Sequence, residues 1–212
     1  MENIIRRTPV VFDRPIKIKE ITDNWEVILE YEKEGPGPYL IDLSHRSRWD
    51  IQDNDLDRFK PWETSIPEIP CHCLLKNGLL INRMNRTQAA IWHLTGEKLD
   101  EPDDSAYTET TDGTIFLCMY GRNVFAIAEK LTSLDFLEPS RKAPFLLQGP
   151  FAHVPCQIVT MKKTDERSGF LLTCSRSYAQ DMVHALLDAG AEFGLQPTGE
   201  NAFQEWIGKF SM

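Results

Sequence analysis

The chain has 212 residues, of which 42% are hydrophobic and 10% aromatic, and its net charge at pH 7 is −9. This size and composition are typical of one large globular domain, or of two small domains that share a core. The negative charge repels phosphate backbones, so we expect no nucleic-acid partner, although a local basic cluster can still hold a small anion.

Cysteine usage and the absence of targeting signals indicate the cytoplasm. The five cysteines are an odd number with mostly apolar neighbours, which predicts reduced, buried thiols rather than a disulfide framework. No apolar run approaches the roughly 20 residues of a membrane span. The first residues, MENIIRRTPVVFDRP, contain no secretory hydrophobic region. We therefore expect a cytoplasmic protein without a membrane span.

The first half of the chain, residues 1–100, is rich in predicted strands. After a turn-rich loop at 32–39, residues 39–49 (YLIDLSHRSRW) are β-prone, and residues 53–62 (DNDLDRFKPW) predict a short helix that ends before Pro61. Residues 71–84 (CHCLLKNGLLINRM) predict two strands joined by a hairpin turn at Asn77-Gly78. Residues 87–94 (TQAAIWHL) predict a further strand or a short helix.

The second half, residues 101–212, has a clearer pattern. An acidic stretch at 96–106 (GEKLDEPDDSA) is predicted to join the two halves, which form one compact unit. The pattern then predicts a strand (114–119), a helix (121–131), a proline-rich ordered loop (138–150), a strand (154–163), a turn (165–168) and a strand (169–174).

A long helix begins after this last strand. Ser177 suits its N-cap, Gln180 would complete a capping box, and Gly194 suits the residue after the helix. With a final strand at 202–207, the order is the split β-α-β of ferredoxin-like folds. The first half hints at the same order, so the fold class is α+β with two related ferredoxin-like halves.

Three patches carry a family resemblance: LIDLSHRSRW (40–49), LCMYGRNVFAIAEKLTSLDF (117–136), and HVPCQIV (153–159) with GFLLTCSRSYAQDMVHALLDAGAEFGLQPTG (169–199). The sequence resembles the folate-binding superfamily of the glycine cleavage T-protein, an aminomethyltransferase. Within that superfamily it looks most like the gamma subunit of heterotetrameric sarcosine oxidase. The resemblance implies a folate-binding α+β body and tetrahydrofolate as a possible cofactor, with no covalently bound cofactor expected.

The sequence departs from the T-protein pattern at two places. Where the resemblance places a catalytic aspartate, this chain has Asn82 and Arg83, and neither side chain can accept a proton as a carboxylate does. Where it places an arginine, Phe203 stands, and the chain ends at Met212 before the expected C-terminal barrel. We therefore name no catalytic residue.

The candidate folate-cavity residues are Arg83, Arg86, Tyr178 and Glu200. Guanidinium groups suit carboxylates such as a folate tail, and Glu200, with Glu205, is an acid near the exit that can substitute for the missing one. Arg46 and Arg48 alternate onto one strand face and are further anion candidates, with surface arginines or ion pairs as the plainer interpretation. Four aromatic side chains can stack on a pterin, although large aromatic residues more often belong to the core or to an interface. They are Trp92, Tyr178, Phe203 and Trp206.

Two other motifs are interpreted as structural. Asp42, Ser44 and His45 are adjacent on one predicted strand, whereas a catalytic triad needs side chains that converge. Cys71-His72-Cys73 lacks the second ligand pair of a closed zinc site, so no metal is expected.

Three functions remain open from the sequence. The leading one is a non-catalytic gamma-like subunit of a sarcosine-oxidase-type, amine-oxidising complex in one-carbon metabolism, whose partner is a larger flavoprotein or dehydrogenase subunit. The second is a stand-alone tetrahydrofolate-binding, aminomethyltransferase-like protein. The third is a structural homo-oligomer that has lost ligand binding.

Overall fold

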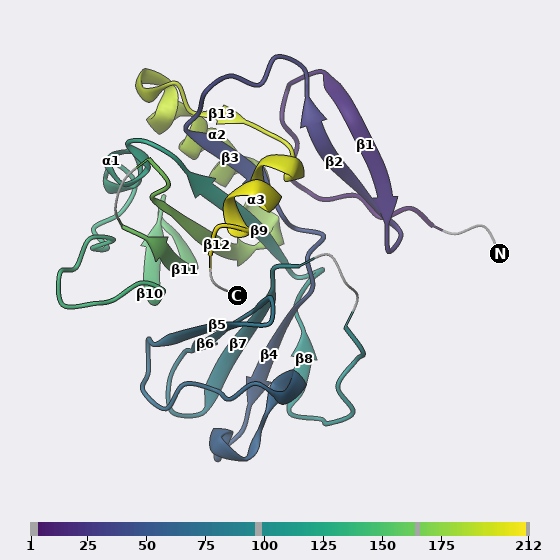
Figure 1. Ribbon diagram of the computed structural model, residues 1–212, viewed down its shortest axis with the longest axis vertical. Helices are drawn as coiled ribbons and strands as arrows, with labels where there is room; N and C mark the ends of the chain where they lie inside the picture. Colours follow the sequence, from purple (N-terminus) through teal and green to yellow (C-terminus); the bar gives the residue numbers. More distant parts are fainter. Residues whose placement is uncertain (1–3, 96–98, 164–165, 211–212) are drawn as a thin grey trace.

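Three β-sheets form the framework of the protein. The computed structural model describes residues 4–95, 99–163 and 166–210, and its elements are labelled in Figure 1. A two-stranded hairpin stands beside a six-stranded and a five-stranded sheet. No helix in these described segments is long and apolar enough to cross a membrane.

The six-stranded sheet has the order β10-β11-β12-β9-β3-β13. Its neighbours are antiparallel except β13, which pairs with β3 in parallel. The strands are β3 (Tyr39–Asp42), β9 (Thr114–Tyr120), β10 (Phe145–Phe151), β11 (Val154–Lys162), β12 (Gly169–Ser175) and β13 (Gln196–Pro197).

The five-stranded sheet has the order β5-β6-β7-β4-β8 and is antiparallel throughout. Its strands are β4 (Arg48–Gln52), β5 (Cys73–Lys76), β6 (Leu79–Arg83), β7 (Gln88–His93) and β8 (Tyr107–Glu109). Each large sheet takes a strand from the other side of residue 100, because β3 lies in the six-stranded sheet and β8 in the five-stranded one.

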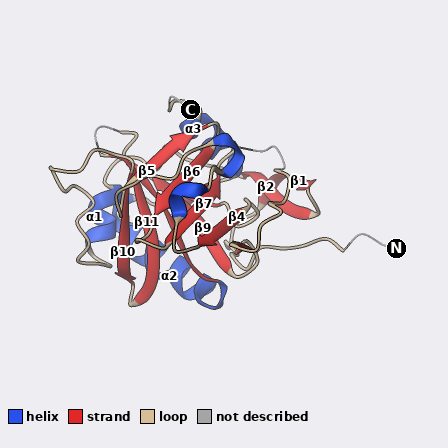
Figure 2. Ribbon diagram, turned by 90° about the horizontal axis from the view of Figure 1, so that it is seen from below, coloured by secondary structure: helices blue, strands red, loops and turns tan. Residues whose placement is uncertain are grey.

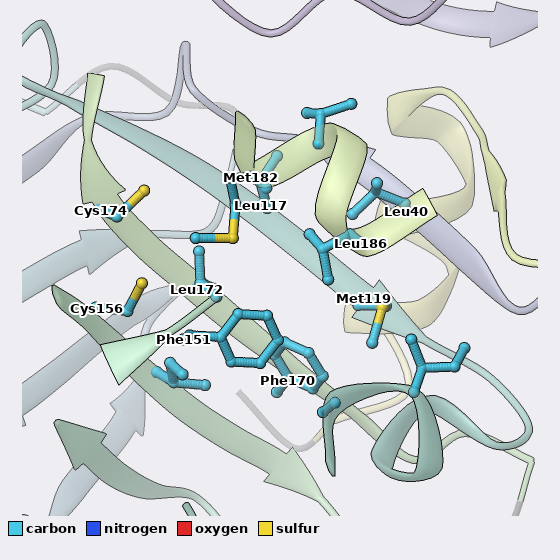
Figure 3. Close-up of a cluster of buried hydrophobic side chains, with 14 of the residues drawn as sticks. Leu40, Leu117, Met119, Phe151, Cys156, Phe170, Leu172, Cys174, Met182 and Leu186 are labelled. Carbon is cyan, nitrogen blue, oxygen red and sulfur yellow. The ribbon is translucent and has the colours of Figure 1, made fainter. Parts of the chain in front are cut away.

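Helices α1 (Val124–Glu129) and α2 (Ala179–Gly190) cover one face of the six-stranded sheet. On α2, Met182, Val183 and Leu186 recur at helical spacing and are fully buried. Figure 3 shows Met182 and Leu186 over the sheet residues of this core. Burial of this stripe stabilises the helix against the sheet.

The other face of the six-stranded sheet packs on the five-stranded sheet. Trp92 of β7 lies against Phe116 of β9, with ring centroids 5.1 Å apart. Helix α3 (Glu200–Ile207) completes this core with Phe203 and Trp206. The Trp206 ring stacks on Tyr120, 5.0 Å between centroids. Trp92, Phe203 and Trp206 are therefore core residues, which is one of the two structural roles expected of them.

The outer face of the five-stranded sheet is covered by two 3₁₀ turns, η1 (Leu56–Arg58) and η2 (Pro61–Glu63). The short helix expected at 53–62 is thus wrong in type. Pro61 and the left-handed backbone at Trp62 (φ 42°) prevent a regular α-helix there.

The hairpin of β1 (Ile16–Thr22) and β2 (Trp25–Tyr31) lies at the margin of the molecule, as Figure 2 shows. Strand β2 packs on α3, because Gly199, just before α3, lets the backbone of Leu29 approach closely. A Cβ on Gly199 would lie 2.2 Å from the Leu29 carbonyl carbon. The sequence patterns did not predict this hairpin.

Several predictions for the second half are confirmed. The predicted strands and helices are found as β9, α1, β11, β12 and α2, but β10 lies between α1 and β11, so the predicted order lacks one strand. The Asn77-Gly78 turn is also confirmed, with φ of 52° and 73° at its two residues, values that match the tight turn of a two-residue hairpin. The acidic stretch and the predicted turn include Gly96 to Lys98 and Asp165, which lie outside the described residues.

Other local predictions are wrong. Residues 202–207 belong to α3 rather than to a strand, because Phe203, Trp206 and Ile207 follow the spacing of one helix face. The capping box does not form: Gln180 Nε2 donates instead to the carbonyl of Pro9 at 2.8 Å. The proline-rich loop at 138–150 is partly strand, since β10 begins at Phe145.

Candidate functional site

A cavity of about 360 Å³ opens between the two large sheets. We call it the inter-sheet cavity. Strands β4 and β7 of one sheet face β10, β11 and β12 of the other across it. Its lining consists of Arg48, Asp50, Met84, Trp92, Thr110, Thr114, Gln148, Gly149, Pro155, Cys156, Gln157, Thr173, Cys174 and Ser175.

Asp50 is the one carboxylate in that lining. Burial raises the pKa of this carboxyl, while Gln88 Nε2, which donates to Asp50 Oδ2 at 3.3 Å, opposes the rise. Trp92 supplies an apolar wall, and the buried Thr173 hydroxyl has no partner among the described residues. A cavity with one acid, an indole and free hydrogen-bonding groups suits a flat ligand with a polar edge.

Sequence reasoning did not single out Asp50. A signal for it exists, because an acid flanked by Trp49 and Ile51 lies in the middle of a β-prone run. Alternation along β4 places Asp50 on the opposite face from those two neighbours.

A second group of polar residues surrounds Glu200, at the first turn of α3. Its Oε1 accepts hydrogen bonds from Arg46 and from Gln204 Nε2 (3.0 Å), and its Oε2 accepts from His45 Nε2 at 2.8 Å. We call these four residues the Glu200 cluster. They join the beginning of α3 to the loop between β3 and β4.

The ion pair at the centre of the Glu200 cluster is deeply buried, with Glu200 and Arg46 only 6% and 4% exposed, whereas Gln204 is exposed. Burial lowers the pKa of Arg46 to about 10, which leaves it charged at neutral pH. Burial and the nearby Arg46 lower the pKa of His45 to about 3. Because Arg46 already neutralises the Glu200 carboxylate, His45 binds it as a neutral imidazole. The cluster is an internal ion pair, and its chemistry is that of a structural brace.

A cavity of about 360 Å³ adjoins the Glu200 cluster. His93 lines it, and burial together with Arg46 lowers the pKa of His93 to about 4. Two acids, Glu20 and Asp23, lie in the same lining.

The four predicted site residues do not come together. Glu200 is in the cluster just described, whereas Tyr178 is exposed ahead of α2. Arg83 is buried and donates to the carbonyls of Asn85 and Arg86, both at 2.8 Å. Arg86 itself is exposed. Arg83 therefore fastens the turn after β6, and no described cavity has two of the four in its lining.

Arg48 was interpreted as a surface or ion-paired side chain, and this is wrong. It is 1% exposed and donates to the carbonyls of Arg46 (2.5 Å), Thr111 (2.8 Å) and Thr114 (3.1 Å). The guanidinium thereby ties β4 to the segment before β9. The alternation of arginines along the strand gave no indication of the Thr111 and Thr114 carbonyls, which lie far along the chain.

Asp42 and Ser44 have the structural role expected. The Ser44 hydroxyl donates to Asp42 Oδ1 at 2.6 Å and accepts from the backbone N–H of Phe116 at 3.0 Å. His45 turns away from both and contacts Glu200. No Ser-His-Asp arrangement is formed by these three residues.

Asn82 occupies the position where the resemblance places an acid. It is fully buried in β6, and neither its Oδ1 nor its Nδ2 has a partner among the described residues. Alternation puts it on the same face as Leu80, which packs toward the six-stranded sheet. The residue is therefore between the two sheets and carries no charge.

All five cysteines are free thiols, and the described part of the chain contains no group of three His, Cys, Asp or Glu side chains placed to bind a metal ion. Cys118, Cys156 and Cys174 are buried, as predicted, whereas Cys71 and Cys73 are only partly buried.

No model of a known protein family matches the sequence, and no curated protein matches it. The fold is similar to those of several solved structures, two of which are described below. A chain of the heterotetrameric sarcosine oxidase from Corynebacterium sp. U-96, in complex with pyrrole 2-carboxylate, aligns with a TM-score of 0.61 and 11% identity, over 76% of this chain and 88% of that one.

The second structure is glycine cleavage system aminomethyltransferase T from Bartonella henselae. It aligns with a TM-score of 0.59 and 12% identity, over 95% of this chain and 62% of that one. This chain thus spans less than two thirds of the aminomethyltransferase. The resemblance inferred from the sequence is confirmed at the level of the fold.

Proposed function

Starting from the fold shared with a sarcosine oxidase chain and an aminomethyltransferase, we propose that this protein is a non-catalytic, gamma-like subunit of a sarcosine-oxidase-type, amine-oxidising complex. The proposal rests on how much of each solved structure aligns with this chain. The alignment takes in 88% of the sarcosine oxidase chain but only 62% of the aminomethyltransferase. In this proposal the chain is a folate-type body with two related halves, 1–100 and 101–212.

The residues around the expected acid support a role without catalysis. Asn82 is neutral and buried, and Arg83 is fully occupied by backbone carbonyls and Asp57. The Glu200 carboxylate is held by Arg46, His45 and Gln204. A carboxylate committed to three internal partners is poorly placed to take a proton from a substrate.

The N-terminal hairpin supplies a surface for a partner chain. Strand β1 pairs with β2 alone among the described strands, so its outer edge presents unpaired backbone groups. Six of the nine large hydrophobic side chains that are exposed in the described segments lie between residues 4 and 21. They are Ile4, Ile5, Val11, Ile16, Ile18 and Ile21.

An unpaired strand edge flanked by isoleucines fits an extended peptide segment, because added strands bind through main-chain hydrogen bonds and apolar pockets. We assign this surface to an extended segment of a larger flavoprotein or dehydrogenase subunit. Lys17 and Lys19 are already engaged by Glu30 and Glu26 of β2, so apolar contact and backbone pairing would dominate the binding.

The test is affinity capture of the tagged chain from its host at near-native level. We expect stoichiometric retention of a flavin- or nicotinamide-binding chain, and loss of that chain in the double variant Ile16→Asp/Ile18→Asp. The matched control is Leu137→Asp, which alters another exposed apolar residue outside the hairpin. Recovery of the bait alone, as a monomer or as a homo-oligomer by light scattering, would count against the proposal.

One observation favours a second candidate function, a stand-alone tetrahydrofolate-binding, aminomethyltransferase-like protein. The inter-sheet cavity holds the Asp50 carboxylate beside Trp92, Gln148 and Gln157. A carboxylate can accept the N–H groups of a pterin, and the indole can pack on its ring. The volume of about 360 Å³ is within the range of small-ligand pockets, so these residues fit the pterin part of tetrahydrofolate.

Calorimetric titration with tetrahydrofolate tests this second candidate. Binding by the wild type that falls at least tenfold in Asp50→Asn would favour it, since the amide loses one acceptor oxygen and its charge. Asp55→Asn, an exposed acid outside the cavity, is the matched control. Absence of heat at every concentration would remove this candidate and leave the subunit proposal intact.

A further inference from the structure

A third cavity lies where the two large sheets meet at their edges. Strand β5 is the edge of the five-stranded sheet and β10 is the edge of the six-stranded one. The backbone joins them directly: Leu146 N–H donates to the Cys71 carbonyl at 3.0 Å, and His72 forms a β-bridge with Phe145. The space beside this junction is about 520 Å³.

Two short segments line this junction cavity, Pro70 to Cys73 and Ser140 to Phe145. They bring two thiols and an imidazole next to the guanidinium of Arg141 and the ammonium of Lys142. None of the ten lining residues is acidic, although the whole chain has a net charge of −9. The cavity is thus a local positive site that would attract a small anion.

The basic side of the cavity is held in place. Arg141 Nη1 donates to the Leu146 carbonyl at 3.1 Å, and its guanidinium lies over the Phe145 ring, 5.6 Å from the centroid. Lys163 Nζ in turn donates to the Arg141 carbonyl at 2.5 Å. The nearby acid Glu138 is outside the lining and accepts from Ser140. The positive charge of Arg141 therefore faces the cavity from a fixed segment.

Cys71 is the thiol best placed to react there. Its backbone is left-handed (φ 65°), a conformation that a non-glycine residue rarely adopts. Burial raises the pKa of the Cys73 thiol, although Arg141 is close enough to oppose the rise, so Cys73 stays protonated. The three remaining cysteines are buried in the six-stranded sheet.

We propose that the junction cavity is a thiol-modification site, at which Cys71 exchanges with low-molecular-weight disulfides that carry negative charge, of which a carboxylate-bearing peptide disulfide is the type. Arg141 and Lys142 bind the carboxylates, and Cys71 provides the nucleophile. This site is separate from the inter-sheet cavity and does not depend on the subunit proposal.

The chemistry is thiol–disulfide exchange and needs no further oxidant. The Cys71 thiolate attacks one sulfur of the reagent, a Cys71–sulfur bond forms, and the sulfur–sulfur bond of the reagent breaks. The departing thiolate takes up the proton that Cys71 released. One mixed disulfide and one free thiol are produced from one protein thiol and one disulfide.

The test compares three symmetrical disulfides of different charge: glutathione disulfide (anionic), hydroxyethyl disulfide (neutral) and cystamine (cationic). The full-length protein is incubated with each at pH 8, and adducts are timed by intact mass and located by peptide mapping. We expect the first adduct at Cys71, formed about tenfold faster with the anionic reagent than with the cationic one. The preference should weaken in 0.5 M salt, because exposed charges are then screened.

Charge variants separate electrostatic recognition from simple exposure. Lys142→Gln, an exposed residue, and Arg141→Gln/Lys142→Gln should reduce the anionic preference stepwise. The matched control is Lys60→Gln/Lys209→Gln, two exposed lysines outside every described cavity, which should leave it unchanged. Cys71→Ser should abolish the first adduct.

Three results would overturn the proposal. The first is that the first adduct forms at another cysteine, such as Cys174. The second is that the anionic and cationic reagents react at equal rates, and the third is that the anionic preference survives in Lys142→Gln and in the double variant. Each variant is checked by circular dichroism first, and Lys142→Gln alone decides the question if the double variant does not fold.

Discussion

Removing the Glu200 carboxylate should cost the protein a large part of its stability. In Glu200→Ala the buried Arg46 guanidinium loses its acidic partner, and such a loss costs about 3–5 kcal/mol. The variant also loses the acceptor for His45 and an acid at the first turn of α3, the latter worth about 0.3–1 kcal/mol. We expect a decrease of about 4 kcal/mol in the free energy of unfolding.

Urea unfolding followed by far-UV circular dichroism measures this effect. With a slope of about 2–3 kcal/mol per molar urea for a chain of this size, the midpoint should fall by roughly 1.5 M. Glu205→Ala removes an exposed acid from the same helix and should change stability by less than about 0.5 kcal/mol. The double variant Arg46→Met/Glu200→Leu should recover most of the loss, because an apolar pair leaves no buried charge behind.

Equal midpoints for Glu200→Ala and Glu205→Ala would refute the reasoning. They would mean that the Arg46 guanidinium finds another partner or reaches water, so that the Glu200 cluster does not brace α3.

Three further predictions concern stability. His93 has a folded-state pKa of about 4 against 6.5 unfolded, so its unfolded form binds more protons between these values. Its stabilising contribution is therefore complete above pH 6.5 and is lost as the pH falls toward 4; His93→Gln should flatten the dependence of the urea midpoint on pH in that window. Gly199→Ala should lower the melting temperature because the added Cβ meets the Leu29 backbone at 2.2 Å, whereas Gly113→Ala, with 3.7 Å to its nearest atom, should have little effect in the same thermal scans. Arg48→Lys should cost about 3 kcal/mol in urea unfolding, because one ammonium cannot serve all the carbonyls that the guanidinium reaches.

Much of the second half could be predicted because its signals are local. The helix stripe of Met182, Val183 and Leu186 follows the helical period, and the neighbouring strand β12 is a short, continuous apolar run. The hairpin turn at Asn77-Gly78 is equally local, because its backbone conformation depends on those two residues.

The elements that sequence patterns miss are decided by distant partners. Residues 39–49 are one β-prone run by residue type, yet the turn that Asp42 and Ser44 stabilise sends β3 and β4 into different sheets. Phe203, Trp206 and Ile207 also suit a strand by residue type, and only their helical spacing indicates α3.

The candidate site was harder to predict than the fold. Arg83, Arg86, Tyr178 and Glu200 were chosen from side-chain chemistry, which does not say where a side chain will point. Asp50 lines the inter-sheet cavity because two sheets made of distant segments pack face to face. That packing is a property of the whole chain, which no short stretch of sequence reveals.

Native mass spectrometry of the protein recovered from its host tests the subunit proposal most directly. We predict a heteromeric assembly that contains this 24.4 kDa chain together with a larger chain that binds flavin or a nicotinamide nucleotide, and that dissociates in Ile16→Asp/Ile18→Asp. A free 24.4 kDa species or a homo-oligomer, found again after mild cross-linking, would contradict the proposal.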